Sequence, residues 1–310
     1  MSSAILFSGQ GSQYVGMCAD LIEHYDVVRE LVEVANNIVG YDLRSIMLNG
    51  PAETLTETRY TQPALFVHEA ALLRVSGVRE AATAVAGHSL GEYTALYAAG
   101  VLTFEDALRL VALRGKLMFE AGLTVPGTMA AVVGLDDDAV EAVCAQLNGK
   151  DGNVLVAANF NSPGQVVISG SADYVRSSMP IFKDRGAKIV KELQVSGAFH
   201  SPLLQVAAEP LAEALSSTEF HDAELDVYTN VTATAERRGY ELRTQAAAQL
   251  TSPVRWTQTM RAMHTAGITS FLEVGPGKVL QGLVKRTIDG ATIDGIDTAA
   301  DVARIVAQRG

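Results

Sequence analysis

Residues 81–91 read AATAVAGHSLG, an apolar run that leads directly into the pattern Gly-x-Ser-x-Gly. The run at Ala81–Gly87 predicts a parallel strand that is covered on both faces, and the residues from Gly91 to Ala99 have helical character. Ser89 therefore falls at a sharp turn between a strand and a helix, where a nucleophilic side chain is forced into the open. The stretch predicts an α/β fold with Ser89 as a nucleophile. The alternative is a structural turn whose serine only caps the helix.

The same α/β alternation continues on both sides of this stretch. Further buried strands are expected at Ala4–Phe7, Asp226–Asn230 and Ser270–Val274. The apolar spacing predicts helices at Asp20–Val39, Gln62–Ser76, Phe104–Ala121, Pro202–Ser216, Trp256–Ala266 and Val279–Ile288.

The pattern changes after Pro126, where about 70 residues read β-α-β-β-α-β, the ferredoxin-like arrangement. Its expected strands and helices are Met129–Val133, Asp136–Leu147, Val154–Ala158, Val166–Ser169, Ala172–Arg185 and Lys188–Val195. We expect an α/β hydrolase-like large domain with a parallel sheet, formed by residues 1–126 and 195–310. A ferredoxin-like small domain, residues 127–194, is inserted into it.

Composition narrows the class of protein. The chain has 310 residues, 48% of them hydrophobic and 19% charged, which excludes a disordered protein. The net charge of −11 argues against a nucleic-acid binder, which needs a clustered basic face. No apolar run is long enough to span a membrane, and no export signal is visible. Cys18 and Cys144 offer neither a disulfide framework nor a zinc spacing. We expect a cytoplasmic monomer that binds no metal, nucleic acid or membrane.

His200 is the best candidate for a general base among the six histidines. It lies in Gly197-Ala198-Phe199-His200-Ser201-Pro202, where the chain returns from the small domain and a cleft would form. His88 adjoins Ser89, but neighbouring side chains at the end of a strand point to opposite faces. A structural histidine at position 200 remains the alternative.

Two further segments could contribute to a site. Gly9-Gln10-Gly11-Ser12-Gln13 follows the first strand but is neither a dinucleotide fingerprint, since Tyr14 takes the place of the third glycine, nor a P-loop. Its main-chain N–H groups could supply half of an oxyanion hole. Arg114, on the long helix after the turn, is either solvated or faces an anion such as a carboxylate, which its planar fork matches.

Seven segments in one order resemble the malonyl-CoA:acyl-carrier-protein transacylases, the malonyl loading enzymes of fatty-acid synthesis. They are spread over nearly the whole chain. The segments are Phe7–Gln13, Gly87–Tyr93, Arg114–Lys116, Ala158–Gln165, Gly197–Ser201, Gln249–Trp256 and Glu273–Gly277. Ser8 stands where the family often has proline.

The resemblance implies roles for individual residues. Ser89 would be the acylated nucleophile and His200 its general base, oriented by the backbone carbonyl of Gln249 rather than by a carboxylate. The main-chain N–H groups of Gln10 and Leu90 would form the oxyanion hole, and Arg114 would bind the malonyl carboxylate. The acyl pocket would be lined by Met118, Asn161 and Phe199.

The implied reaction moves a malonyl group from malonyl-CoA to the phosphopantetheine thiol of acyl carrier protein. It follows a ping-pong path through an acyl-Ser89 and needs no metal or redox cofactor. Three alternatives stay open at this point: a trans-acting malonyl loader of a polyketide synthase, a serine thioesterase or hydrolase, and a carrier-binding protein without turnover. The hydrolase is disfavoured because the chain has no HGGG-like oxyanion segment.

Overall fold

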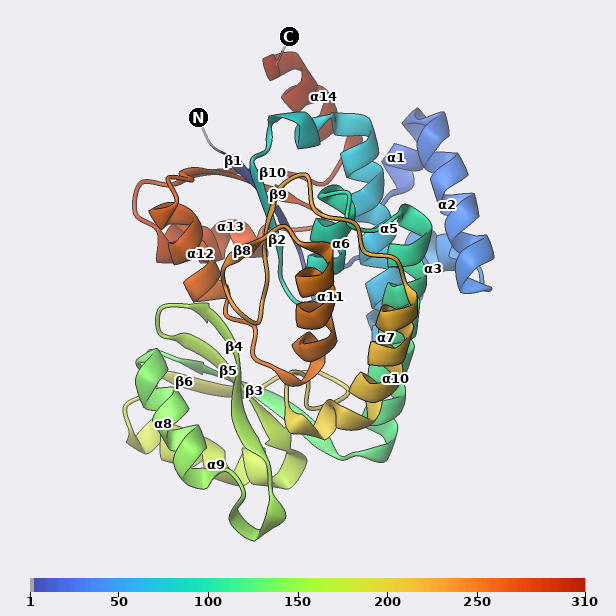
Figure 1. Cartoon of the computed structure of the whole chain (residues 1–310). Coiled ribbons are helices and arrows are strands. Elements are labelled where there is room, and N and C mark those ends of the chain that lie inside the picture. The colour runs from blue at the N-terminus through green and yellow to red at the C-terminus, as the bar shows by residue number, and fades with distance from the viewer. Residues whose placement is uncertain (1–2, 310) are drawn as a thin grey trace.

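The structure, a computed structural model, describes residues 3–309 and is built on two sheets (Figure 1). The large sheet has the strand order β10-β9-β1-β2-β7-β8 within these residues. Its strands are β1 (Ser3–Phe7), β2 (Ala84–Gly87), β7 (Asp226–Tyr228), β8 (Ala235–Glu236), β9 (Ser270–Val274) and β10 (Thr292–Ile296). Neighbours from β10 through β7 are parallel, whereas the short β8 runs antiparallel to β7 at the edge.

The central strand β1 is apolar at successive positions because both of its faces are buried. Ile5 and Phe7 point into the core on one face of the large sheet, while Ala4 and Leu6 point into the core on the other. A parallel strand covered on both faces needs apolar side chains at every position.

Helices cover both faces of the large sheet (Figure 1). One face packs against α5 (Thr58–Ser76), α6 (Gly91–Ala98) and α7 (Phe104–Thr124), and the other against α12 (Trp256–Thr265) and α13 (Val279–Thr287). The other helices are α1 (Ala19–His24), α2 (Asp26–Val39), α3 (Leu43–Asn49), α4 (Ala52–Thr56), α10 (Gln205–Ser217), α11 (Gly239–Ala248) and α14 (Ala299–Arg309). Among residues 3–309, no helix combines the length and apolarity needed to cross a membrane.

The small sheet lies at the end of the molecule away from the termini (Figure 1). Its strands are β3 (Gly127–Val133), β4 (Leu155–Ser162), β5 (Gln165–Ser171) and β6 (Ile189–Glu192), in the order β4-β5-β3-β6 with antiparallel neighbours. The helices α8 (Asp137–Leu147) and α9 (Ala172–Asp184) pack on it around a separate apolar core. This is the ferredoxin-like arrangement that the sequence predicts.

Several expected elements differ in their bounds from those in the structure, among them the strand expected at Lys188–Val195, which ends at Glu192. The single helix at Asp20–Val39 is wrong, because Tyr25 adopts an extended conformation and separates α1 from α2. The helix expected from Gln62 begins at Thr58 and contains Pro63. Proline has no N–H for the carbonyl of Arg59 four residues earlier, and the Tyr41 hydroxyl donates to that carbonyl instead, over 3.3 Å. The strand expected to reach Asn230 ends at Tyr228.

Candidate active site

Ser89 lies at a tight turn between the end of β2 and the start of α6. Its φ of 54° is in the left-handed region, which is uncommon for a residue with a side chain. The flanking glycines are required by close packing. A Cβ on Gly87 would lie 1.8 Å from the carbonyl carbon of Gly91, and one on Gly91 would lie 2.3 Å from the Phe7 oxygen. The turn therefore has the compressed strand–helix geometry that the sequence predicts.

His200 faces Ser89 from the segment that leaves the small sheet. Its Nε2 lies 2.8 Å from Ser89 Oγ. Its Nδ1 lies 3.1 Å from the Gln249 carbonyl oxygen and 3.2 Å from that of Ser252. Two acceptors at Nδ1 place the proton there, which leaves Nε2 to accept from the serine hydroxyl. Burial and the positive charge of Arg114 lower the pKa of His200 to about 3, so the imidazole is neutral at pH 7.

Arg114 reaches the same point from α7, and its side chain is almost completely buried. Its Nη2 donates to Ser89 Oγ over 3.0 Å and to Gln249 Oε1 over 2.9 Å, and its Nη1 donates to Gln62 Oε1 over 2.8 Å. Its Nε has no partner within the described residues, and burial lowers the pKa of this guanidinium. A buried guanidinium bonded only to neutral oxygens is suited to receive an anion.

Gln10 and Leu90 each have a main-chain N–H without a hydrogen-bond partner among the described residues. Both residues line the same cavity as Ser89. Leu90 stands at the start of α6, where the helix dipole favours negative charge. Gln10 is fixed by its side chain, whose Nε2 donates to Thr58 Oγ1 over 3.0 Å.

The cavity has a volume of about 370 Å³ and is lined by strands of the small sheet and by loops and helices that adjoin the large sheet. Met118 and Phe199 are buried in its wall. Asn161 Oδ1 lies 2.8 Å from His88 Nε2, which keeps His88 away from Ser89 Oγ. Burial lowers the pKa of His88. The site residues that the sequence predicts therefore meet around one cavity, with Gln249 packed behind it.

The structure adds contacts that sequence reasoning missed. Gln249 was singled out for its backbone carbonyl alone, yet its side-chain Nε2 also donates to the Ser89 carbonyl over 2.9 Å. Gln62 contacts both Arg114 and Met118: its Oε1 accepts from Arg114 Nη1, and its Nε2 lies 3.1 Å from Met118 Sδ. Asn230 accepts the Ser89 N–H. No local pattern marks Gln62 or Asn230, because each acts on a partner far away in the sequence.

No group of three or more His, Cys, Asp or Glu side chains among the described residues is placed to hold a metal ion.

The fold and the serine site define an acyl transferase, and the chain belongs to that family: the acyl transferase domain model matches residues 5–307. More particularly, it is 46% identical to the malonyl CoA-acyl carrier protein transacylase of Haemophilus influenzae, over 92% of both chains. It is 42% identical to the Bacillus subtilis protein of the same name, over 91% of this chain and 89% of that one.

The chain is also similar to solved structures of malonyltransferases. An acyl carrier protein S-malonyltransferase from Vibrio cholerae matches 98% of this chain and 100% of its own, with a TM-score of 0.93 and 41% identity. A malonyl-transacylase solved in complex with a type II PKS acyl-carrier protein matches 99% of this chain and 100% of its own, with a TM-score of 0.93 and 39% identity.

Proposed function

We propose that this chain is a malonyl-CoA:acyl-carrier-protein transacylase that works through a malonyl ester on Ser89. The observation that carries the proposal is the buried guanidinium of Arg114 beside the nucleophile oxygen. A malonyl group is an acyl group that ends in a carboxylate. The cavity therefore offers a nucleophile for the thioester carbonyl and a cation for the free carboxylate at adjacent points.

In the first half-reaction, Ser89 Oγ attacks the thioester carbonyl of malonyl-CoA while its proton moves to His200 Nε2. The negative charge that develops on the carbonyl oxygen is stabilised by the main-chain N–H groups of Gln10 and Leu90. The carbon–sulfur bond then breaks, and His200 returns the proton to the leaving thiolate. CoA leaves as the thiol, and the malonyl group remains as an ester on Ser89.

The second half-reaction reverses these steps with a different thiol. The phosphopantetheine thiol of the carrier gives its proton to His200 and attacks the ester carbonyl, and Ser89 recovers its proton as it leaves. His200 is suited to both directions because the carbonyls of Gln249 and Ser252 hold its other nitrogen protonated. Neither half-reaction contains a redox step, so we propose no cofactor.

Arg114 is assigned the selectivity for a carboxylated acyl group. Its guanidinium can make two parallel hydrogen bonds to a carboxylate, which acetyl lacks. Met118, Asn161 and Phe199 are assigned to the wall around the acyl group, as all three line the cavity.

We also propose that the two sheets are cores of separate domains, residues 1–126 with 195–310 and residues 127–194. The substrate would then bind in the cleft between them, since the cavity is lined from both sides. The working form is proposed to be a cytoplasmic monomer.

One experiment separates the transferase from its alternatives. Purified enzyme is given malonyl-CoA with a fatty-acid carrier protein, with a polyketide carrier protein, or alone. A transacylase produces malonyl-carrier and little free malonate, and the preferred carrier identifies the pathway. Rapid release of malonate without any carrier would instead identify a thioesterase, and no turnover of either kind would identify a binding protein.

A further inference from the structure

The turn that carries Ser89 needs support, because its backbone is in a conformation that L-residues avoid. The φ of 54° at Ser89 costs conformational energy, which surrounding contacts must offset. Gly87 and Gly91 permit the turn, but a glycine offers no side chain to hold it. The contacts that fix the peptide of Ser89 therefore decide where the nucleophile oxygen stands.

We propose that Asn230 is a positioning residue that holds the Ser89 turn in its reactive geometry. Its Oδ1 accepts the main-chain N–H of Ser89 over 2.7 Å, and its Nδ2 donates to the carbonyl oxygen of Gly87 over 2.7 Å. One primary amide thus joins the two sides of the turn, using one donor and one acceptor. The proposal rests on the proposed role of Ser89 as the nucleophile.

The backbone of Asn230 is itself anchored on both sides. Its N–H donates to Glu92 Oε2 in the first turn of α6, and its carbonyl accepts from the N–H of Arg255 over 3.0 Å. Asn230 is almost completely buried. Since β7 pairs with β2 up to the partners Ala86 and Tyr228, the residue two places further on lies beside the turn.

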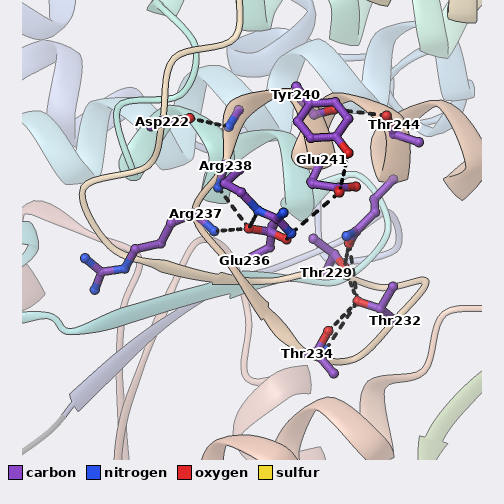
Figure 2. A network of polar contacts seen from close by, with 12 residues as sticks. Asp222, Thr229, Thr232, Thr234, Glu236, Arg237, Arg238, Tyr240, Glu241 and Thr244 are labelled. Atoms are coloured by element: carbon purple, nitrogen blue, oxygen red, sulfur yellow. Dashed lines mark hydrogen bonds and ion pairs between the residues drawn. The ribbon is translucent and has the colours of Figure 1, made fainter.

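The polar network of Figure 2 joins the loop after β7 to α11. Thr229 and Thr232 both hydrogen bond to Gln245 on α11, and Thr234 donates to Thr232 Oγ1 over 2.9 Å. Arg238 pairs with Glu236, which fixes the approach to α11. These contacts give the Asn230 amide a rigid base from which to hold the turn.

Asn230 does not itself line the cavity, and neither hydrogen bond of its amide goes to Arg114. Its loss should therefore displace the nucleophile and leave the binding of malonyl-CoA intact. A displacement of about 1 Å from reactive geometry can cost about 100-fold in rate. The expected signature is a fall in the acylation rate constant without a comparable change in the dissociation constant.

The first test compares Asn230→Ala with the wild type and with Thr257→Val. Thr257 donates one buried hydrogen bond to the Phe160 carbonyl, away from the Ser89 turn, so its variant controls for a general loss of stability. Two readouts are used: single-turnover acylation by malonyl-CoA, and the rate of Ser89 labelling by a small fluorophosphonate. For Asn230→Ala we expect both rates to fall by about 100-fold or more, with Thr257→Val close to wild type.

Equal rates in Asn230→Ala and the wild type would overturn the proposal, as would equal losses in the two variants. If the wild type itself is not labelled at Ser89, it is the proposed nucleophile that fails rather than its positioning.

A second variant covers the case in which Asn230→Ala does not fold. In Asn230→Asp, the protonated carboxyl has one donor and one acceptor, as the amide has, whereas the ionised carboxylate has only acceptors and faces the Gly87 carbonyl. Glu92, the acidic side chain that contacts Asn230, and burial both favour the protonated form. Labelling relative to wild type should therefore increase as the pH falls from 8 to about 5.5. A ratio that does not change with pH would contradict the proposal.

Discussion

Arg114 Nη2 lies 3.0 Å from Ser89 Oγ, the same oxygen that lies 2.8 Å from His200 Nε2. The serine hydroxyl can therefore accept from the guanidinium while it donates to the imidazole. A positive charge at this distance favours negative charge on Oγ as its proton leaves. The same charge lowers the pKa of His200. Arg114 thus affects the nucleophile and the base as well as the proposed carboxylate site.

Removing this arginine should reduce both rate and selectivity. Truncating one member of a buried charge pair typically costs about 2–5 kcal/mol, which corresponds to roughly 30- to 5,000-fold. In Arg114→Ala the rate of malonyl transfer should fall by a factor in this range. The variant should also lose part of the wild type's discrimination against acetyl-CoA. A competition assay with the two thioesters measures both effects, and Lys116→Ala, an exposed change on the same helix, serves as the control. An unchanged malonyl-to-acetyl ratio would remove Arg114 from the selectivity mechanism.

The charge of Arg114 should also be visible in the pH dependence of the nucleophile. His200 acts as a base only when neutral, so reactivity is lost as the pH falls through its pKa of about 3. In Arg114→Gln the nearby positive charge is gone, the pKa of His200 is higher, and the acidic loss of reactivity should begin at a higher pH. This shift is measured by fluorophosphonate labelling of Ser89 at a series of pH values between 4 and 8, spaced about one pH unit apart. Arg109→Gln, at an exposed position of α7, should behave as wild type.

Phe199 should contribute a weaker, steric filter. It is buried in the cavity wall next to His200, and a smaller side chain there leaves space for one more methyl group. A buried methyl group is worth about 0.8 kcal/mol, less than the charge pair. We expect Phe199→Ser to accept methylmalonyl-CoA while it still excludes acetyl-CoA, as judged by competition among the three thioesters. Acceptance of acetyl-CoA would mean that Phe199, rather than Arg114, controls the carboxylate requirement.

Glu69 should make the stability of the protein depend on pH. Its carboxyl is fully buried in α5, where it accepts from Ser8 Oγ over 2.7 Å and from Thr94 Oγ1 over 2.5 Å. Burial raises its pKa from 4.5 to about 8. Between these two values the folded protein keeps a proton that the unfolded chain has lost, so the free energy of unfolding should decrease as the pH rises from 4.5 to 8.

Glu69→Gln removes this titration and should flatten the dependence of stability on pH over that range. Denaturant unfolding at several pH values measures it, with Glu53→Gln at an exposed position as the control. If Glu69→Gln shows the same slope as wild type, Glu69 does not carry the titration.

The sequence was sufficient where a short segment carries its own physical constraint. Gly87 and Gly91 mark the Ser89 turn because close backbone approach forbids any other residue there, and the small sheet follows from regular alternation and turns. Strand β10 was missed, because Thr292–Ile296 lies at the sheet edge with only Ile296 buried and so lacks an apolar run.

The support of the site could not be predicted for a different reason. The Asn230 amide meets the Ser89 N–H across 141 residues, and the Gln249 side chain meets the Ser89 carbonyl across 160. A single polar residue gives no periodic signal, and only the tertiary fold determines which main-chain group it reaches. Resemblance identified Gln249 through its carbonyl, but the two contacts of its side chain appear only in the structure.

The most direct measurement is intact-protein mass spectrometry after brief mixing with malonyl-CoA. The wild type should gain the mass of one malonyl group, fragmentation should place it on Ser89, and added carrier protein should remove it and become malonylated. Ser89→Ala should show no adduct while its thermal unfolding is nearly unchanged, since loss of one hydroxyl that already faces the cavity leaves almost no new void. An adduct that persists in Ser89→Ala, or a wild-type adduct that water removes as fast as the carrier does, would contradict a serine-based malonyl transferase.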